Sequence, residues 1–386
     1  MSRPLGRALL AVTVAFAAAG LMVILTQSQA SRLSSDFTIN YSAGALVREG
    51  HLAAPYDQAA LGEMMRRVAP DGAIDPRLPF SLPLAAALPY ALLSLLPFEV
   101  AFRLFQLLSA ALVLLAVLLL RRVAPTVPSL AAILGLLAAV PTWGTLTEGQ
   151  PTAWLFLGAA MALLALRSDS RALAAGAGML LAVKPQYLPA YLAILFAARR
   201  WRSLLAAALG GGLLLLSPLA GGLAGLSGMV HNALSANQAV AIRLNESWIG
   251  LIGPVLSAHV ATLVAIGLYL AVLATLGLLA WRRPGSINGF AVLAGTLAVL
   301  ASPHTLPHDL LLLAAPAWLA MALCLDETLP NPIPAVLALD AALLIDLRGV
   351  PIPVGPIVMT VSLVCYGWQF KQRATQRRRS PIGRAA

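Results

Sequence analysis

Charged residues are scarce in this sequence. Asp, Glu, Lys and Arg make up only 11% of the 386 residues, whereas apolar residues make up 60%. Soluble domains carry about a quarter charged residues, so the composition excludes an ordinary soluble domain. Apolar runs recur along the whole length, which predicts one all-α polytopic membrane protein rather than a soluble domain with a single anchor.

Cysteine is also rare in the sequence, and nucleotide-binding motifs are absent from it. The only two cysteines, Cys324 and Cys365, both lie inside apolar runs, which indicates structural thiols and argues against a disulfide or a metal site. The sequence has no D-x-D motif for a metal-bound nucleotide sugar and no G-x-x-x-x-G-K-[ST] loop for ATP. We therefore expect no cofactor, no nucleotide and no obligatory metal.

The net charge of +11 does not indicate a nucleic-acid partner, because the basic residues stand in small clusters between apolar runs. That distribution is typical of the cytoplasmic loops of membrane proteins. The tail over residues 371–386, which begins "KQRATQRRRS", is predicted to be a cytoplasmic end that faces the lipid surface.

The apolar runs predict twelve membrane spans with both termini inside the cell. A further apolar segment, Ser81–Pro97, is interpreted as a helix or hairpin on the outer face, because counting it as a span would place most basic clusters outside. The first run could instead be a signal peptide, since small residues follow it, but its length favours a retained helix. The expected spans are Ala8–Leu25, Val100–Leu120, Ser129–Trp143, Pro151–Leu166, Ala172–Val183, Gln186–Ala198, Ser203–Ala220, Val255–Trp281, Ile287–Ala301, Leu310–Leu325, Pro332–Leu347 and Ile352–Phe370.

This topology predicts one membrane-embedded domain over residues 1–386, with a long outer loop over residues 26–99. It places a large group of charged and polar side chains on the outer face. These side chains need an explanation, because charge near hydrocarbon is costly and usually functional. We expect them to form one outward-facing polar cavity. They are Asp36, Arg48, Glu49, Asp57, Glu148, Gln150, Lys184, Arg243, Glu246, His304, His308 and Asp309.

An enzyme and a carrier both fit such a cavity. Carriers hold their substrate near the middle of the bilayer, whereas these polar residues lie on one side of it. The outer loop is also long and contains helical spacing in "QAALGEMMRRV". Both features favour an enzyme, with a non-enzymatic transporter or lipid flippase as the alternative.

Several segments carry a family resemblance. "DFTINYSAGALVREGHLAAPYD", "LPFSLPLAAALPYALLSLLP", "EGQPTAWLFLGAAMALLALR" and "SPHTLPHDLLLL" follow in order along the chain. Together they resemble glycosyltransferase family 87, whose members are GT-C-type enzymes that use polyprenyl-phosphate sugars. The resemblance implies a GT-C fold and the transfer of a hexose, most often mannose, to a glycolipid or glycan acceptor.

The resemblance also implies roles for residues on the outer face. Asp36 follows the first helix and would be the general base that deprotonates the acceptor hydroxyl; a plain N-cap is the alternative. Lys184 lies in the apolar stretch "LLAVKPQYL", where an unpaired ammonium is costly. It would bind the donor phosphate, and the alternative is a lysine that extends to the membrane interface.

The remaining candidates are less specific. His304 and His308 would contact the phosphate, with His308 preferred, while a metal site or a proton relay is disfavoured because Pro303 and Pro307 interrupt the helical pairing of the two rings. Glu148 and Gln150 are expected either to cap the helix that follows or to bind sugar hydroxyls. The other candidate contacts to the acceptor, the sugar or the lipid headgroup are Tyr41, Arg48, Tyr56, Gln238 and Arg243.

The sequence therefore predicts an inverting hexosyltransferase in the cytoplasmic membrane, with its active site on the exterior or periplasmic side. Its partners would be a polyprenyl-phosphate sugar, an acceptor and membrane lipid, with no nucleic acid. A ligase or polymerase that uses a lipid-linked oligosaccharide remains a third alternative, which would require a diphosphate donor.

Overall fold

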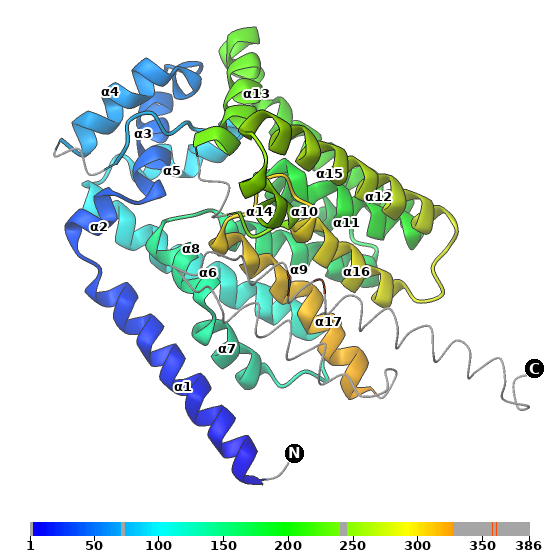
Figure 1. The fold of residues 1–386 in the computed structure, drawn as a ribbon. Coiled ribbons are helices and arrows are strands. Elements are labelled where there is room, and N and C mark those ends of the chain that lie inside the picture. The colour runs from blue at the N-terminus through cyan, green and yellow to red at the C-terminus, as the bar shows by residue number, and fades with distance from the viewer. Residues whose placement is uncertain (1–2, 71–73, 240–244, 327–356, 358–359, 361–386) are drawn as a thin grey trace, which may run out of the picture.

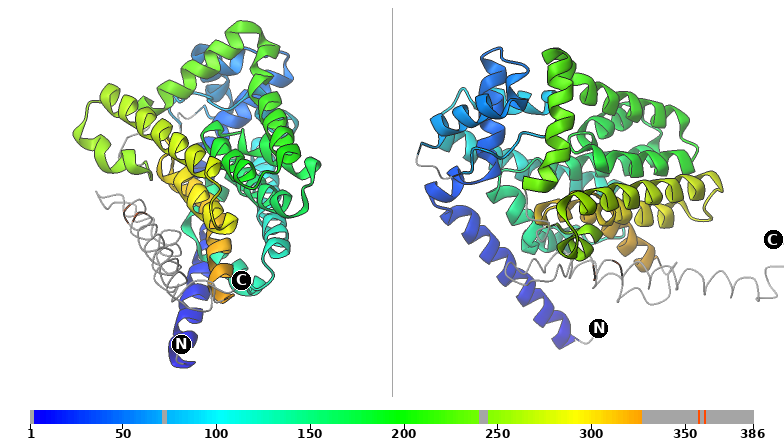
Figure 2. Two further views of the ribbon diagram at one scale, coloured as in Figure 1. Left: turned by 90° about the vertical axis from the view of Figure 1, so that its right-hand side faces the viewer. Right: turned by 45° about the horizontal axis from the view of Figure 1, so that its top comes forward.

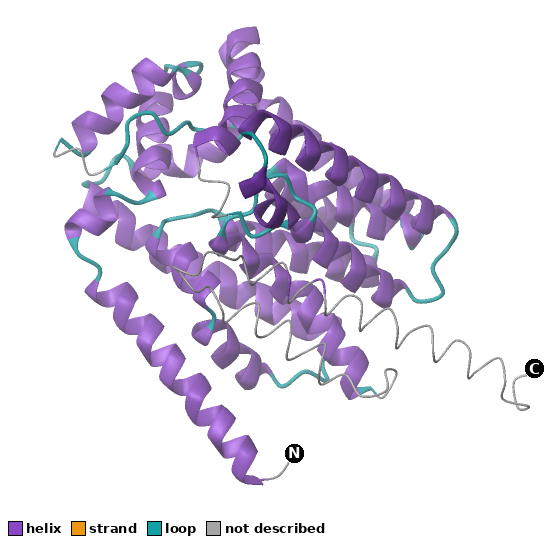
Figure 3. Ribbon diagram, viewed as in Figure 1, coloured by secondary structure: helices purple, strands orange, loops and turns teal. Residues whose placement is uncertain are grey.

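The structure is a computed structural model, and it describes residues 3–70, 74–239 and 245–326 together with Ile357 and Thr360. All regular structure within these residues is helical (Figure 3). The α-helices are α1 (Arg3–Thr26), α2 (Gln29–Leu33), α3 (Asp36–Arg48), α4 (Gln58–Val68), α5 (Leu88–Leu93), α6 (Phe98–Val123), α7 (Ser129–Ala138), α8 (Val140–Thr147), α9 (Thr152–Ser168), α10 (Arg171–Leu181), α11 (Leu188–Ala197), α12 (Trp201–Leu216), α13 (Gly222–Ala239), α14 (Trp248–Ile252), α15 (Ala258–Trp281), α16 (Ile287–Leu300) and α17 (Ala314–Leu325).

Short 3-10 helices join several of these elements at prolines, which fix the backbone and remove a hydrogen-bond donor. They lead from one α-helix into the next with a change of direction. The 3-10 helices are η1 (Ala54–Tyr56), η2 (Leu84–Ala87), η3 (Pro185–Tyr187), η4 (Ser217–Gly221), η6 (Gly253–Val255) and η7 (Pro307–Leu313).

Helix α9 lies at the centre of the core. It is apolar on all sides, which predicts a fully buried helix, and most of its residues are buried. Helices α6, α10, α11 and α17 pack around it. Beyond them, α12 packs against α10, and α15 and α16 pack against α11. The two turned views show α1 leaving this body and running along one side (Figure 2).

The segment expected as the first outer loop folds into a helical cap at one end of the bundle (Figure 1). Helix α3 is its centre: residues 37–47 are all buried, and α4 and α5 pack against it. Phe37 makes ring contacts with Tyr41, Tyr90 and Phe102, and these aromatic side chains form a small core of their own. The segment expected as an outer helix or hairpin, Ser81–Pro97, is helical and contributes α5 to this cap.

The twelve spans are not confirmed. Within the described residues, three helices are long and apolar enough to cross a membrane, namely Phe98–Val123, Trp201–Ser235 and His259–Trp281. The expected span Ser129–Trp143 is broken into α7 and α8, which bend by 61° and would make a fourth span together. The other expected spans fall on shorter apolar stretches of helix, such as Leu10–Thr26 of α1 and Thr152–Ser168 of α9. The exceptions are the last two, Pro332–Leu347 and Ile352–Phe370, which lie almost wholly outside the described residues.

Large apolar side chains nevertheless cover the outside of the long helices. Leu107 of α6, Leu213 of α12 and Leu263 of α15 are among those exposed by more than half. Soluble monomers rarely expose apolar surface on this scale. The helices and their exposed leucines therefore indicate a membrane protein, in agreement with the composition.

Candidate active site

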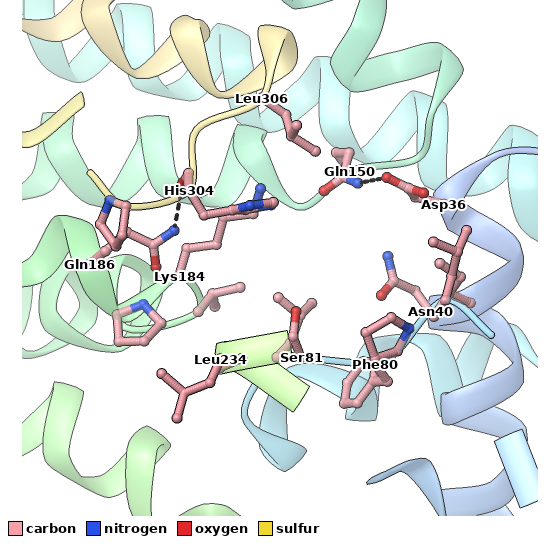
Figure 4. Close-up of a pocket in the computed structure, with 18 of the residues that line it drawn as sticks. Asp36, Asn40, Phe80, Ser81, Gln150, Lys184, Gln186, Leu234, His304 and Leu306 are labelled. Carbon is pink, nitrogen blue, oxygen red and sulfur yellow. Dashed lines mark hydrogen bonds between the residues drawn. The ribbon is translucent and has the colours of Figure 1, made fainter. Parts of the chain in front are cut away.

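A cavity of about 420 Å³ lies between the helical cap and the core helices. It falls within the roughly 300–1,000 Å³ of typical small-molecule sites. Asp36 and Gln150 lie on one side of it, and Lys184, Gln186 and His304 lie on the other (Figure 4). Four of the predicted site residues, from distant parts of the sequence, therefore share one cavity.

Asp36 is the first residue of α3, and the packing of that helix directs it to the cavity. The N-cap position belongs to Ser35, so the plain capping interpretation of Asp36 is wrong. The Phe37 N–H donates to the Glu148 carbonyl oxygen at 2.9 Å, which ties the start of α3 to the segment before α9. The Gln150 side-chain amide donates to Asp36 Oδ2.

Burial raises the pKa of the Asp36 carboxyl above its ordinary value of 3.8. Two contacts work against this rise, namely the positive charge of Lys184 and the hydrogen bond from Gln150, while the negative charge of Asp309 adds to it. A carboxylate with a raised pKa binds a proton more readily than an ordinary aspartate, which suits a general base.

Lys184 precedes the proline that starts η3 and is buried, with 8% of its surface exposed. Its Nζ donates to Asp309 Oδ1 at 2.6 Å. The lysine is therefore buried and paired with a carboxylate 125 residues away, whereas its apolar sequence neighbours suggested an ammonium without a partner in the protein. Asp309 is fully buried and also accepts from Thr152 Oγ1 at 3.1 Å and from the Leu306 N–H at 3.2 Å. The contact with Leu306 caps the start of η7.

The two histidines differ in their access to the cavity. His304 is one of the residues that line it, and burial together with the charge of Lys184 lowers the pKa of this imidazole to about 4. His304 is therefore neutral near pH 7. His308 is buried behind the wall, with its Nε2 at 3.3 Å from Lys184 Nζ and 3.6 Å from Asp309 Oδ1. His304, rather than the preferred His308, is the imidazole at the surface of the cavity.

Three predicted binding residues do not line the cavity. Tyr41 donates to the Leu96 carbonyl oxygen at 2.8 Å, and Tyr56 donates to the Leu82 carbonyl oxygen at 2.8 Å. Arg48 donates to the Ser94 carbonyl oxygen. All three acceptors belong to one segment, so these side chains hold α3 and η1 against residues 82–96.

The other predicted residues have different positions. Glu148 is the C-cap of α8 and is not among the residues that line the cavity, whereas Gln150 binds Asp36 and does not cap α9, whose N-cap is Pro151. Gln238 belongs to α13, but its side chain lies outside the described part, and Arg243 lies outside the described residues altogether.

The structure adds cavity residues that sequence reasoning missed. Asn40 lines the cavity one helical turn after Asp36, and that i, i+4 spacing was a usable signal. Gln186 lies two residues after Lys184; its side chain donates to the His304 carbonyl oxygen at 3.2 Å, and its own carbonyl oxygen accepts from Tyr269 at 2.8 Å. No local signal marked Tyr269 or Ser81, which reach the cavity through long-range packing.

The cavity has a chemical polarity that a group-transfer reaction requires. A carboxylate with raised proton affinity stands on one side, and a buried ammonium with a neutral imidazole stands on the other. Apolar side chains, among them Leu234 of α13, Ile266 of α15 and Leu306, complete the wall. This arrangement can accept a proton at one end and hold an anion at the other.

Comparison with known proteins agrees with this chemistry. The profile of glycosyltransferase family 87 matches residues 80–303, which is more than half of the chain and includes Gln150 and Lys184. Asp36 and Asp309 lie outside the matched range. No curated protein and no solved structure matches the chain. The match shows that this chain belongs to glycosyltransferase family 87 and is a membrane glycosyltransferase, which uses a sugar donor and an acceptor.

Proposed function

We propose that the protein transfers a hexose, namely mannose, from polyprenyl phosphate to a hydroxyl of a glycolipid or glycan acceptor. One observation carries this proposal. The Asp36 carboxylate and the Lys184 ammonium face a single cavity from opposite sides, as a base and an anion site must in a transfer from a phosphate leaving group.

In the proposed reaction the acceptor oxygen attacks the anomeric carbon while the bond from that carbon to the phosphate oxygen breaks. Asp36 takes the proton of the acceptor hydroxyl, and polyprenyl phosphate leaves with the electron pair of the broken bond. Polyprenyl phosphate is a good leaving group, so one base suffices and the anomeric configuration inverts. This differs from the paired carboxylates of glycoside hydrolases. Gln150 holds the carboxylate toward the cavity through its hydrogen bond.

The donor phosphate is assigned to the side of the cavity that carries Lys184 and His304. An ammonium is a compact point charge suited to phosphate oxygens, and a neutral imidazole can donate one hydrogen bond without adding charge. Asp309 supports the proposal indirectly, because its carboxylate compensates part of the cost of burying the lysine side chain. His308 contacts Lys184 from behind and acts as a positioning residue.

The apolar part of the cavity wall supports an isoprenoid donor rather than a nucleotide sugar. Leu234 lines the cavity and is 53% exposed, and it lies one helical turn after Val230, which is 47% exposed. An apolar surface that continues from the reaction centre to the outside of the molecule fits a lipid tail, because apolar contact there removes hydrocarbon from water.

The arrangement of the basic clusters supports a location for the reaction. In the twelve-span topology expected from the sequence, seventeen of the 26 lysines and arginines fall on the side opposite to the site, which favours a site at the exterior or periplasmic face of the cytoplasmic membrane. The proposal therefore names a periplasmic glycosyltransferase, with the acceptor reaching the cavity from outside.

The direct test uses purified protein in lipid nanodiscs with radiolabelled polyprenyl-phosphate mannose and a mixture of membrane glycolipids as acceptors. We expect release of polyprenyl phosphate and labelled product, and a loss of about 10²–10⁴-fold in rate for Asp36→Asn. Binding of the donor should remain. A folded D36N variant with the wild-type rate contradicts the proposal. Movement of intact donor across the bilayer without release of polyprenyl phosphate identifies a flippase instead.

A further inference from the structure

Seven arginines gather at the ends of the core helices that point away from the cavity. They stand in three short segments, namely residues 167–171 from the end of α9 to the start of α10, residues 199–202 from the α11–α12 connection into α12, and residues 282–283 after α15. These segments contain a single acid, Asp169. We call this set the arginine face. It consists of Arg167, Arg171, Arg199, Arg200, Arg202, Arg282 and Arg283.

The three segments meet in space. The Arg200 Nε–H donates to the Leu166 carbonyl oxygen at 3.2 Å, which joins the start of α12 to the end of α9. Arg199 donates to the Trp281 carbonyl oxygen at 3.1 Å, which joins it to the end of α15. Helix α9 has 17 residues, so at 1.5 Å per residue it separates this end from the cavity by about 25 Å.

Three aromatic side chains surround Arg199 in the arginine face. Its guanidinium lies 5.1 Å from the ring centre of Phe196, 5.4 Å from Trp201 and 5.7 Å from Trp281. These distances are typical of cation–π contacts. Trp201 and Trp281 are 51% and 66% exposed, so their rings also form part of the outer surface.

Five arginines of the face are exposed and have no carboxylate partner within the described part of the chain. Asp169 pairs only with Arg200, at 3.8 Å, and also accepts from Ser203. Arg167 is engaged with the amide oxygen of Asn288. The exposed arginines without an acid are Arg167, Arg171, Arg202, Arg282 and Arg283.

Apolar surface continues directly from this charged end along two helices. Leu205 and Leu209 of α12 are 61% and 64% exposed, and Leu278 of α15 is 49% exposed. Along the protein surface, arginines at the helix end are followed by tryptophans and then by leucines. A phospholipid presents its phosphate, glycerol and acyl chains in the same order. A soluble anion would use the charges but not the apolar surface.

We propose that the arginine face is a binding site for an anionic phospholipid of the membrane. Arg202, Arg282 and Arg283 hold the phosphate of the headgroup, Trp201 and Trp281 lie at the level of the glycerol, and the acyl chains run along the exposed leucines of α12 and α15. This site is separate from the cavity and does not depend on the transfer reaction.

The test compares two matched arginine pairs, each exposed and each at the C-terminal end of a long apolar helix. The variant Arg282→Gln/Arg283→Gln alters the proposed site, and Arg121→Gln/Arg122→Gln, at the end of α6, is the control. Each purified protein is placed in phosphatidylcholine nanodiscs with increasing phosphatidylglycerol, and bound lipid is counted by native mass spectrometry after release.

We expect phosphatidylglycerol to stay bound to the wild type and to the control pair, and to bind the Arg282/Arg283 variant at least threefold more weakly. Inorganic phosphate at the same concentration should not compete. Equal retention by both variants would mean that the arginines contribute only general surface charge and would overturn the proposal, as would equal competition by phosphate. If the double variant does not fold, Arg202→Gln gives the same comparison against Arg122→Gln.

Discussion

At the scale of single residues, burial and the Asp36–Gln150 contact act in opposite directions on the proton affinity of the proposed base. Burial raises the pKa of Asp36, and the hydrogen bond from Gln150 opposes that rise because it stabilises the ionised carboxylate. Asp36 can act as a base only when ionised, so the transfer rate is expected to increase with pH as this carboxyl loses its proton. The acidic limb of the pH–rate profile should therefore lie above the ordinary aspartate value of 3.8.

Replacing Gln150 with Leu removes the stabilising bond and should raise the pKa of Asp36 further. The acidic limb of kcat/KM then moves to higher pH, while the rate on the plateau falls less than in D36N. A profile measured from pH 4 to pH 8 on the wild type and Gln150→Leu checks this. An unchanged limb in a folded variant would show that Gln150 does not act on the charge of Asp36.

Also at this scale, the Lys184–Asp309 pair is expected to affect both the stability of the fold and the binding of the donor. Both groups are buried, so removing one charge leaves the other without compensation, which costs about 3–5 kcal/mol in comparable pairs. We expect Asp309→Asn to lower the unfolding temperature markedly. The double variant Lys184→Met/Asp309→Asn carries no buried charge at this position and should recover much of the loss, yet it should bind the donor poorly.

Thermal unfolding and donor binding, measured on the same preparations, separate the two effects. The control is Glu63→Gln, because Glu63 pairs with Arg67 on the exposed side of α4, where ion pairs contribute little. Its unfolding temperature should match the wild type. A double variant that is stable and binds the donor normally would remove Lys184 from the phosphate site.

At the scale of elements, α10 and α12 pack closely because glycines line their contact. A Cβ at Gly210 would overlap the Ala175 carbonyl oxygen, and a Cβ at Gly178 would overlap the Ala207 carbonyl oxygen. Small residues permit such close approach between membrane helices. Gly210→Ala should force the helices apart and cost about 1–3 kcal/mol.

Gly212 lies on the same helix, and a Cβ there would meet no atom within 4 Å. Gly212→Ala should therefore be neutral or stabilising by about 0.5–1 kcal/mol, because alanine favours the helix more than glycine does. Unfolding temperatures in one detergent give the comparison. Equal destabilisation by both substitutions would contradict the close-packing explanation.

Helix positions were largely predictable from the sequence, since apolar runs end at basic clusters, prolines and glycines. The break between α7 and α8 was not, because Pro141 lies inside a run that reads as one span. The orientation of α3 was also missed. Helices α4 and α5 pack against α3 on sides away from the cavity, so Tyr41 and Arg48 meet backbone carbonyl oxygens instead of the cavity.

The contacts that build the site depend on packing over long sequence separations. Asp36 and Gln150 are 114 residues apart, and Lys184 and Asp309 are 125 residues apart. Sequence reasoning placed these residues on one side of the membrane by counting charges between apolar runs. It could not pair them, because nothing in either local segment specifies its partner.

At the scale of the whole molecule, the cavity and the arginine face lie at opposite ends of α9, which predicts that they face opposite sides of the membrane. Labelling tests this in a background where Cys324 and Cys365 are replaced by Ala. Ala59→Cys places a thiol on exposed α4 of the helical cap, and Gly285→Cys places one in the exposed α15–α16 loop.

A membrane-impermeant maleimide should label Ala59→Cys in intact spheroplasts and Gly285→Cys only in inverted vesicles, because the two arginines that precede Gly285 favour retention inside the cell. Both thiols should react after detergent solubilisation, which controls for accessibility. The reverse pattern would place the cavity on the cytoplasmic side, where Asp36 would meet a different set of acceptors. Labelling of both thiols from the same side would mean that α9 and its neighbours do not separate the two faces of the membrane.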